Sequence, residues 1–170
     1  MKNNFIYNYH KIIIIGCAGS GKSYFARELN QKLNIPLYHL DLLYWKENWV
    51  ETPREEFVLV IKEIMKNDKW IIDGNYSYSL EDRVKEADLI FYLDLPTQVC
   101  LDSEKERRGK KRPDLPEYLE EKYDEEFITF IKEFKKNKRP AVLELLKKYP
   151  EKKVVIFTSR EEKEEFVKSI

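Results

Sequence analysis

The segment from Gly16 to Ser23 has the residue types and the spacing of a phosphate-binding loop. Its letters, GCAGSGKS, fit the pattern G-x-x-x-x-G-K-[ST]. The glycines allow backbone N–H groups to curl around phosphate oxygens, and a following helix N-terminus adds its positive dipole. Lys22 is expected to reach the β- and γ-phosphates, and the Ser23 hydroxyl is expected to ligate Mg²⁺. The loop therefore predicts a nucleoside triphosphate site whose contacts come from Gly16, Ala18, Gly19, Ser20, Gly21, Lys22 and Ser23.

Two aspartates follow short apolar runs, at positions where strands of a parallel sheet would end. Asp73 comes directly after Trp70–Ile72, and Asp41 follows Leu37–Leu40. Ligands of open parallel sheets bind outside the carboxyl ends of the strands. Asp73 is therefore a candidate Mg²⁺ ligand beside Ser23, and Asp41 a candidate to orient or deprotonate an acceptor hydroxyl. The alternatives are a turn-forming Asp73 and a helix-capping or surface Asp41.

Aromatic side chains come just after Asp41, at Tyr44, Trp45 and Trp49. Their rings could stack on a ring-shaped acceptor or cover an edge of the core. Asp94 also ends an apolar run, and its position before Leu95-Pro96 favours a helix-cap role.

A basic stretch lies between Glu104 and Arg112, where six of nine residues are Lys or Arg. We interpret residues 104–118 as a lid inserted into the domain, in which Arg107 and Arg112 would stabilise charge on a transferring phosphoryl group. A nucleic-acid patch and a solvated charged face are the alternatives. Arg83 is a candidate contact to the acceptor or its phosphate, and a surface ion pair with Glu81 or Asp82 is its alternative.

The composition describes a globular protein with a heavily charged surface. Hydrophobic residues make up 42% and charged residues 36%, and 31 basic residues balance 31 acidic ones. This balance disfavours a dedicated duplex-DNA binder, although it leaves nucleic-acid binding open. No apolar run approaches the roughly 20 residues of a membrane span. With two cysteines, the chain favours a reducing compartment, and we expect a cytoplasmic protein.

Buried strands alternate with helices along the chain, which predicts an α/β domain of residues 1–170 with a parallel sheet between helices. The expected strands are Lys11–Ile15, Leu37–Leu40, Trp70–Ile72, Leu89–Leu93 and Val154–Phe157. Helices are expected over residues 23–33, 52–67 with Thr52 as its cap, 80–87, 96–108, from Tyr118 onward, 141–149, and after a Ser159 cap with Glu162.

Several segments resemble the topology modulation proteins, a branch of adenylate kinase-like P-loop kinases. They are IGCAGSGKS, PLYHLDLLYWKENW, WIIDGNY, ADLIFYLDLP and the tripeptide Arg112-Pro113-Asp114, and the similarity runs from Lys11 to about Phe166. The resemblance implies a three-layer P-loop kinase fold with a five-stranded parallel sheet in the order 2-3-1-4-5 and a short lid. It also implies that Lys22 and Ser23 serve ATP and Mg²⁺.

The same resemblance places Asp41 on the acceptor side, Asp73 at the metal-side strand end, and Arg139 where related kinases contact a phosphate or the base. Such kinases usually carry Arg-x-x-x-Arg at the lid entrance, whereas here Ser103 precedes Arg107. The preference for a particular base therefore stays open.

The sequence thus predicts an Mg-ATP-dependent P-loop kinase that transfers the γ-phosphate to a small hydroxyl or phosphate acceptor. Asp41, Trp45, Asn75 and Arg83 are the acceptor-side candidates. The alternative is an ATP-binding regulatory or DNA-topology-associated protein with little kinase activity. The identity of the acceptor and the oligomeric state are left open.

Overall fold

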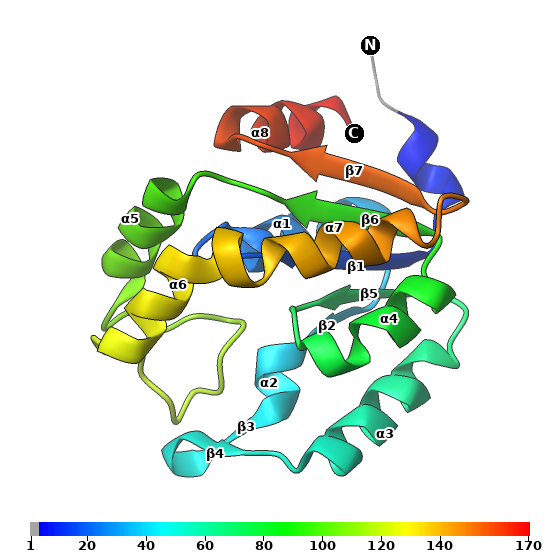
Figure 1. The fold of residues 1–170 in the computed structure, drawn as a ribbon. Helices are drawn as coiled ribbons and strands as arrows, with labels where there is room; N and C mark the ends of the chain where they lie inside the picture. The colour runs from blue at the N-terminus through cyan, green and yellow to red at the C-terminus, as the bar shows by residue number, and fades with distance from the viewer. Residues whose placement is uncertain (1–3) are drawn as a thin grey trace.

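A five-stranded parallel sheet forms the centre of the computed structural model, which describes residues 4–170 (Figure 1). Its strands are β1 (Lys11–Gly16), β2 (Leu37–His39), β5 (Trp70–Asp73), β6 (Leu89–Leu93) and β7 (Lys153–Phe157). They lie in the order β2-β5-β1-β6-β7. Two further strands, β3 (Trp45–Lys46) and β4 (Val50–Glu51), pair antiparallel in a separate ribbon that the sequence did not predict. Because this ribbon takes two of the strand numbers, the order reads differently from the expected 2-3-1-4-5.

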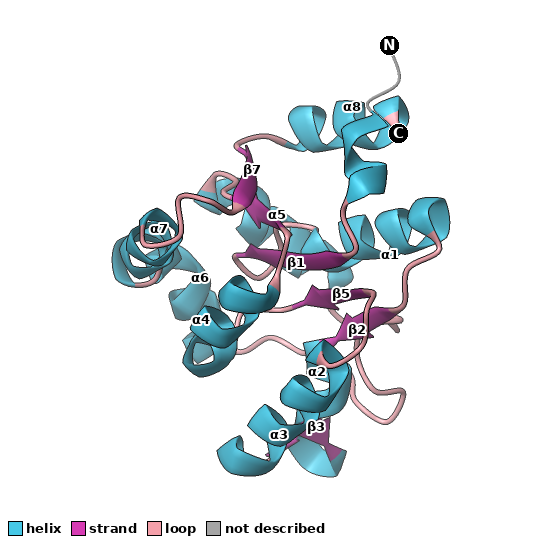
Figure 2. Cartoon of the chain, turned by 90° about the vertical axis from the view of Figure 1, so that its right-hand side faces the viewer, coloured by secondary structure: helices cyan, strands magenta, loops and turns pink. Residues whose placement is uncertain are grey.

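Helices cover both faces of the sheet, as Figure 2 shows in a view turned from that of Figure 1. A short 3₁₀ helix, Asn4–Asn8, precedes β1, and another, Glu47–Trp49, joins β3 to β4. The α-helices are α1 (Lys22–Leu33), α2 (Leu40–Tyr44), α3 (Arg54–Met65), α4 (Ser77–Glu86), α5 (Thr97–Arg107), α6 (Glu125–Asn137), α7 (Arg139–Lys147) and α8 (Arg160–Ser169). Within residues 4–170, no helix is both long enough and apolar enough to cross a membrane.

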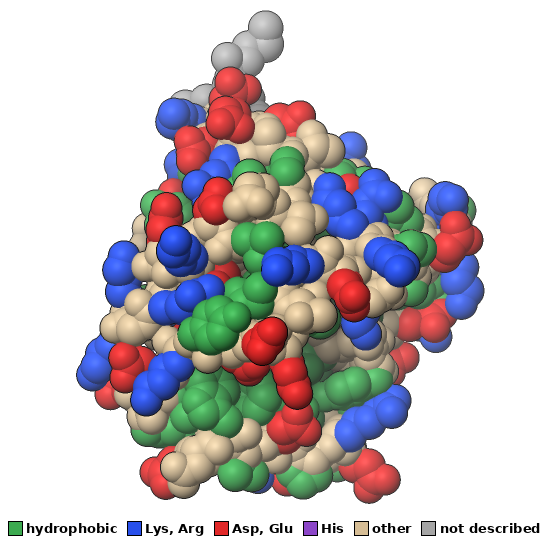
Figure 3. Space-filling view, turned by 60° about the vertical axis from the view of Figure 1, so that its left-hand side comes forward, with side chains coloured by type: hydrophobic (Ala, Val, Ile, Leu, Met, Phe, Trp, Pro, Cys, Tyr) green, Lys and Arg blue, Asp and Glu red, His purple; other side chains and the backbone are tan. Residues whose placement is uncertain are grey.

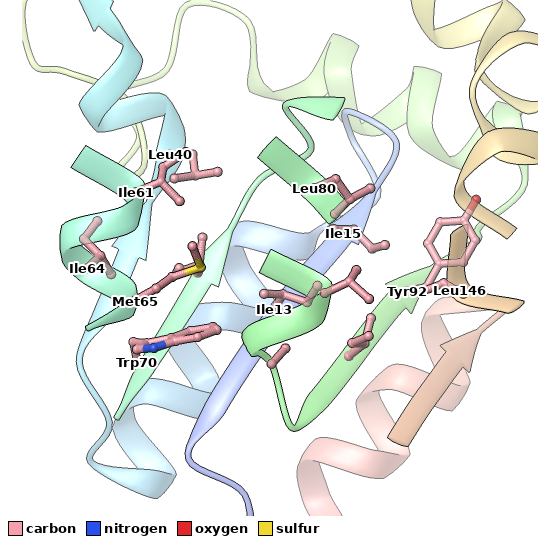
Figure 4. Packing of buried hydrophobic residues seen from close by; sticks show 14 of the residues in the cluster. Ile13, Ile15, Leu40, Ile61, Ile64, Met65, Trp70, Leu80, Tyr92 and Leu146 are labelled. Carbon is pink, nitrogen blue, oxygen red and sulfur yellow. The ribbon is translucent and has the colours of Figure 1, made fainter. Parts of the chain in front are cut away.

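The central strand β1 is buried on both faces, and its isoleucines alternate between two cores. Ile13 and Ile15 face a core formed with α3, α4 and α7, part of which is drawn in Figure 4. Ile12 and Ile14 face the other core, which contains residues of α1 and α8. Fully burying an isoleucine stabilises the fold by about 1.5–3 kcal/mol. This double-sided burial holds β1 rigidly, and the phosphate-binding loop follows directly from its end.

The segment between α5 and α6, residues 108–124, corrects the prediction of a helix from Tyr118. Helix α6 begins instead at Glu125, after Asp124 caps it by accepting hydrogen bonds from the backbone N–H groups of Glu126 and Phe127. Leu119 is buried but Tyr123, four residues later, is 64% exposed, so the apolar spacing does not form a continuous buried helix face there. We call residues 108–124 the α5–α6 segment.

Two predicted helix caps are wrong, and a third is confirmed. The Thr52 hydroxyl donates to the Tyr44 carbonyl at 2.7 Å instead of capping α3, which follows Pro53. Asp94 bonds to Arg139 and does not cap α5. Ser159 does cap α8, because its hydroxyl accepts from the Glu162 N–H at 3.2 Å.

Candidate functional site

The phosphate-binding loop runs from the carboxyl end of β1 to the first residue of α1, Lys22. Gly19 and Gly21 have φ angles of 81° and 83°, a left-handed conformation that side chains disfavour. A Cβ at Gly19 would also collide with the carbonyl oxygen of Cys100 on α5. The loop therefore needs glycine both for its backbone conformation and for its close approach to α5.

Ser23 and Asp73 meet at the carboxyl edge of the sheet, as their sequence positions predicted. The Ser23 hydroxyl donates to Asp73 Oδ2 at 2.6 Å, and His39 Nδ1 lies 2.7 Å from the same oxygen. Asp73 is 3% exposed, and its other carboxylate oxygen, Oδ1, has no hydrogen-bond partner among residues 4–170. A buried carboxylate oxygen with a free lone pair beside a hydroxyl is a donor set that suits Mg²⁺. The residues present therefore fit the ion.

His39 is a member of this cluster that the sequence analysis did not identify. His39 ends β2, and Asp73 stands opposite it in the register of β2 with β5. The contact between His39 and Asp73 could have been predicted, because each of these polar residues ends one of two neighbouring strands.

Asn75, predicted on the acceptor side, lies against the phosphate-binding loop. Its side-chain amide accepts from the Gly16 N–H at 3.1 Å and donates to the Gly16 carbonyl at 2.7 Å. The two bonds satisfy both backbone groups of the first loop residue, so Asn75 fixes the point where the loop leaves β1.

Arg83, predicted to contact the acceptor or its phosphate, is fully buried beneath the turn that carries Asn75. Its guanidinium donates to the Gly74 carbonyl at 2.8 Å and also to the carbonyls of Asn75 and Tyr76. Burial lowers the pKa of Arg83 to about 10, an effect that the nearby Asp73 charge partly offsets. Arg83 therefore holds the turn after β5.

Asp41 lies on α2, directly after β2, and accepts a hydrogen bond of 2.6 Å from the Tyr76 hydroxyl. Burial raises the pKa of Asp41, and the Lys22 ammonium and the Tyr76 bond partly counteract that rise. Burial, followed by the negative charge of Asp41, raises the pKa of Tyr76. A carboxylate with raised proton affinity that senses the charge of Lys22 could accept a proton from an acceptor hydroxyl.

Trp45 lies in the aromatic group that follows Asp41. Its ring contacts Tyr44 at 4.9 Å and Trp49 at 5.3 Å between ring centroids. Tyr118 of the α5–α6 segment donates its hydroxyl to the Trp45 carbonyl at 3.0 Å. This bond ties the α5–α6 segment to the residues around Asp41.

Arg107 and Arg112, the two arginines predicted to serve transfer, converge on the buried Glu121. Arg107 donates to Glu121 Oε1 at 2.9 and 3.0 Å, and Arg112 Nη1 lies 3.0 Å from Oε2. Arg112 also lies 3.5 Å from Asp114, which Arg27 approaches at 3.4 Å from the other side. The sequence analysis did not identify Glu121 because its partners, Arg107 at the end of α5 and Arg112 in the α5–α6 segment, lie at irregular spacing along the chain.

Asp114, like Glu121, is a buried acid among arginines. Burial favours its neutral form, but the attraction of Arg112, followed by that of His39 and Arg27, outweighs this effect and holds its pKa below the ordinary value. Its side chain is therefore an anion that the neighbouring arginines stabilise.

Arg139 begins α7, and its Nε–H is shared between the two carboxylate oxygens of Asp94, at 3.0 and 2.9 Å. Asp94 follows β6 and lines the same small hollow as Cys17 of the phosphate-binding loop. Arg139 is thus brought near the loop through Asp94. Ser103, at the entrance to the predicted lid, accepts a hydrogen bond from Arg160 at the start of α8.

Comparison with solved structures shows that the chain has the fold of P-loop kinases. A shikimate kinase from Acinetobacter baumannii in complex with shikimate matches with a TM-score of 0.64 and 17% identity, covering 96% of this chain and 91% of that chain. A shikimate kinase from Bacteroides thetaiotaomicron matches with a TM-score of 0.54 and 19% identity over 94% and 95%. A gluconokinase from Sinorhizobium meliloti 1021 matches with a TM-score of 0.55 and 15% identity over 94% and 88%. No protein-family model and no curated protein matches the chain.

Proposed function

We propose that this protein is an Mg-ATP-dependent kinase that phosphorylates a hydroxyl group of a small molecule. The observation that carries the proposal is the meeting of three parts at the carboxyl edge of the sheet. They are a phosphate-binding loop whose conformation requires glycine, the Ser23–Asp73 pair at 2.6 Å, and Asp41, whose pKa the charge of Lys22 lowers in part. The kinase fold shared with shikimate kinases and a gluconokinase supports the same reaction class.

In this proposal the loop residues Gly16 to Ser23 hold ATP, and Ser23 and Asp73 hold Mg²⁺. Mg-ATP supplies the phosphoryl group and the charge neutralisation that its transfer needs. Lys22 contacts the phosphates, and Asn75 ties the start of the loop to the turn after β5 through its bonds to Gly16. His39 orients the Asp73 carboxylate, because it contacts the oxygen that also binds Ser23.

Asp41 is the proposed proton acceptor for the reacting hydroxyl. Its raised pKa favours this role, because a carboxylate with higher proton affinity removes a hydroxyl proton more readily. Tyr76 orients Asp41 through its hydroxyl, and Trp45 is proposed as a further contact to the acceptor.

Arg107 and Arg112 are proposed to contact the transferring phosphoryl group after exchanging Glu121 for phosphate oxygens. The α5–α6 segment would then act as a lid, and its bond from Tyr118 to Trp45 gives it a contact with the acceptor side. Arg139 is proposed as a further ATP contact, reached when it leaves Asp94.

The sequence resemblance to topology modulation proteins is compatible with this proposal, and proteins of that family are suitable for the same kinase assay. The alternative, a regulatory protein that binds nucleic acid through its basic stretch, receives less support. Arg107, Arg108 and Arg112 of that stretch each pair with a buried carboxylate, which reduces the positive charge open to a phosphate backbone.

The test is ADP production from Mg-ATP with and without a panel of nucleosides, nucleoside monophosphates, sugars and hydroxy acids. Lys22→Ala should abolish acceptor-stimulated ADP, whereas Lys62→Ala, an exposed lysine on α3, should leave it unchanged. Stimulation by one acceptor class, with a phosphorylated product, supports the kinase. ADP production that stays flat across the panel, despite ATP binding, refutes it.

A further inference from the structure

We infer that Lys163 of α8 is a second lysine of the nucleotide site and binds the α-phosphate, the phosphate next to the nucleoside. The inference rests on the proposed function, because it names a further contact of the same phosphate-binding loop. It is carried by the position of a buried ammonium group beside the uncapped N-terminus of α1.

Helix packing places Lys163 beside the phosphate-binding loop. Phe166 lies three residues further along α8, on the same side of the helix, and packs against Phe25 of α1 with 6.2 Å between ring centroids. Phe25 comes four residues after Gly21, the residue at the N-cap position of α1. A Cβ on Gly21 would lie 3.2 Å from Lys163 Nζ. The ammonium group is therefore next to the last glycine of the loop.

Lys163 is buried without an anion as its partner. It is 7% exposed, yet within residues 4–170 its ammonium forms neither a hydrogen bond nor an ion pair, and the Tyr24 ring lies 5.7 Å from Nζ. Burial lowers the pKa of Lys163, an effect that the charges of Glu164 and Glu28 partly offset. On the face that Figure 3 shows, by contrast, Lys and Arg side chains are interspersed with Asp and Glu side chains. Lysine is almost never buried unless it is paired, so this ammonium calls for an anion that the protein does not supply.

The N-terminus of α1 calls for the same anion. Gly21 has no side chain to cap the helix, and the first turn of α1 contains no acidic residue. The N–H groups and the helix dipole carry positive partial charge there, and Lys163 adds a full positive charge. These positive groups repel one another unless an anion neutralises them. Phosphate is the anion that the loop pattern specifies.

The order of the strands indicates which phosphate Lys163 binds. Lys22 is proposed to contact the β- and γ-phosphates, and the Ser23–Asp73 pair marks the metal side of the site, toward β5 and β2. Lys163 approaches from α8, which follows β7 at the opposite edge of the sheet (Figure 1). A triphosphate whose γ end faces β5 has its nucleoside end on the side of β7. The α-phosphate is therefore the phosphate nearest Lys163.

Lys163→Met tests the contact, because methionine keeps an unbranched apolar chain and removes the charge. Affinities for Mg-ATP and Mg-ADP, measured by titration calorimetry, should fall about tenfold or more, as expected for the loss of a charge-assisted hydrogen bond. Tm should stay the same or rise, because the variant no longer buries an unpaired charge. A lysine that only supported the fold would instead lower Tm on replacement. Lys168→Met, which replaces an exposed lysine of α8, is the matched control and should change neither quantity.

Acyl phosphates identify the phosphate that Lys163 contacts. In acetyl-AMP the acetyl group is attached to the α-phosphate. The Lys163 amine attacks the acetyl carbonyl carbon, an amide bond forms, the bond to the phosphate oxygen breaks, AMP leaves, and the amine proton goes to solvent. Peptide mass spectrometry should find the acetyl group on Lys163, and excess Mg-ATP should suppress this labelling. ATP acylated on its γ-phosphate should label Lys22 instead, and Lys62, exposed on α3, measures unspecific acetylation.

The outcomes separate this inference from the proposed function. Labelling of Lys163 that Mg-ATP suppresses, together with weaker nucleotide binding and an undiminished Tm in Lys163→Met, supports the inference. Unchanged ATP affinity in Lys163→Met, a fall in its Tm of more than about 4 °C, or the absence of protected label on Lys163 overturns it. The proposed kinase still stands in those cases, provided that the wild-type protein binds ATP and transfers phosphate. A wild-type protein that binds no ATP refutes both.

Discussion

Replacing Arg83 with methionine distinguishes an arginine that holds a turn from one that binds an acceptor. Methionine keeps an unbranched apolar chain of similar reach but donates no hydrogen bond. Arg83→Met would leave the carbonyls of Gly74, Asn75 and Tyr76 without the donor that now satisfies them. Each such loss costs about 1–3 kcal/mol.

The net destabilisation is smaller than the sum of these losses, because the variant no longer buries a charge. Burial opposes the ionised form of Arg83, as its lowered pKa of about 10 indicates, and removing the guanidinium recovers that cost. We expect a net loss of about 3–5 kcal/mol, less than the summed cost of leaving three carbonyls unsatisfied. For a chain of this size this corresponds to a fall in Tm of about 6–20 °C.

Thermal unfolding followed by circular dichroism measures the loss of stability. ATP binding, measured below the lowered Tm, shows whether the change also weakens the nucleotide site. The loosened turn should weaken ATP binding, because Asn75 can no longer hold Gly16 in place. Arg54→Met is the control: Arg54 is exposed and lies over the Tyr78 ring at 4.7 Å, a contact worth about 1 kcal/mol or less. If Arg83→Met keeps its Tm within about 2 °C and raises KM for the acceptor alone, Arg83 binds the acceptor and this reasoning is wrong.

Three further predictions concern the loop, the proton acceptor and the α5–α6 segment. Because burial raises the pKa of Asp41, its carboxylate forms at higher pH than an exposed one, so kcat/KM should rise with pH through an apparent pKa above the ordinary aspartate value. Asp41→Asn should lower kcat about 10²- to 10⁴-fold and remove that rise, and a rise that persists contradicts its role. Gly19→Ala should lower stability by more than about 1 kcal/mol and weaken ATP binding, because its Cβ meets Cys100. Gly109→Ala carries similar φ strain without that collision, so equal losses in calorimetry for both variants would refute the close-approach argument. Glu121→Gln should speed hydrogen exchange in the α5–α6 segment about tenfold, since its two arginines lose their anion, and unchanged exchange would show that the pairing does not hold the segment.

The parts of the site that sequence reasoning predicted are those in which spacing along the chain fixes position in space. The phosphate-binding loop is local, so Lys22 and Ser23 follow from the pattern itself. The meeting of Ser23 with Asp73 follows from one further rule, that the carboxyl ends of parallel strands share an edge. Their 2.6 Å contact joins residues that lie 50 positions apart.

The remainder depended on side-chain directions that a sequence does not contain. Arg83 and Arg112 both lie near the site. Arg83 is fully buried under backbone carbonyls, whereas Arg112 pairs with acids of the α5–α6 segment. Charge alone made both appear available to a ligand. Burial separates them, because a buried guanidinium must be satisfied locally.

The four consecutive residues from Asp73, the end of β5, to Tyr76 each have a different role in the site. Asp73 faces Ser23, and Gly74 has a φ of 142° where a Cβ would lie 2.9 Å from the Leu40 side chain. Asn75 holds the phosphate-binding loop, and Tyr76 holds Asp41. One turn thus connects the proposed metal, nucleotide and acceptor sites, and the buried arginine beneath it fixes their mutual distances. Damage to this turn should therefore impair ATP binding and phosphoryl transfer together, whereas damage to Asp41 alone should impair transfer.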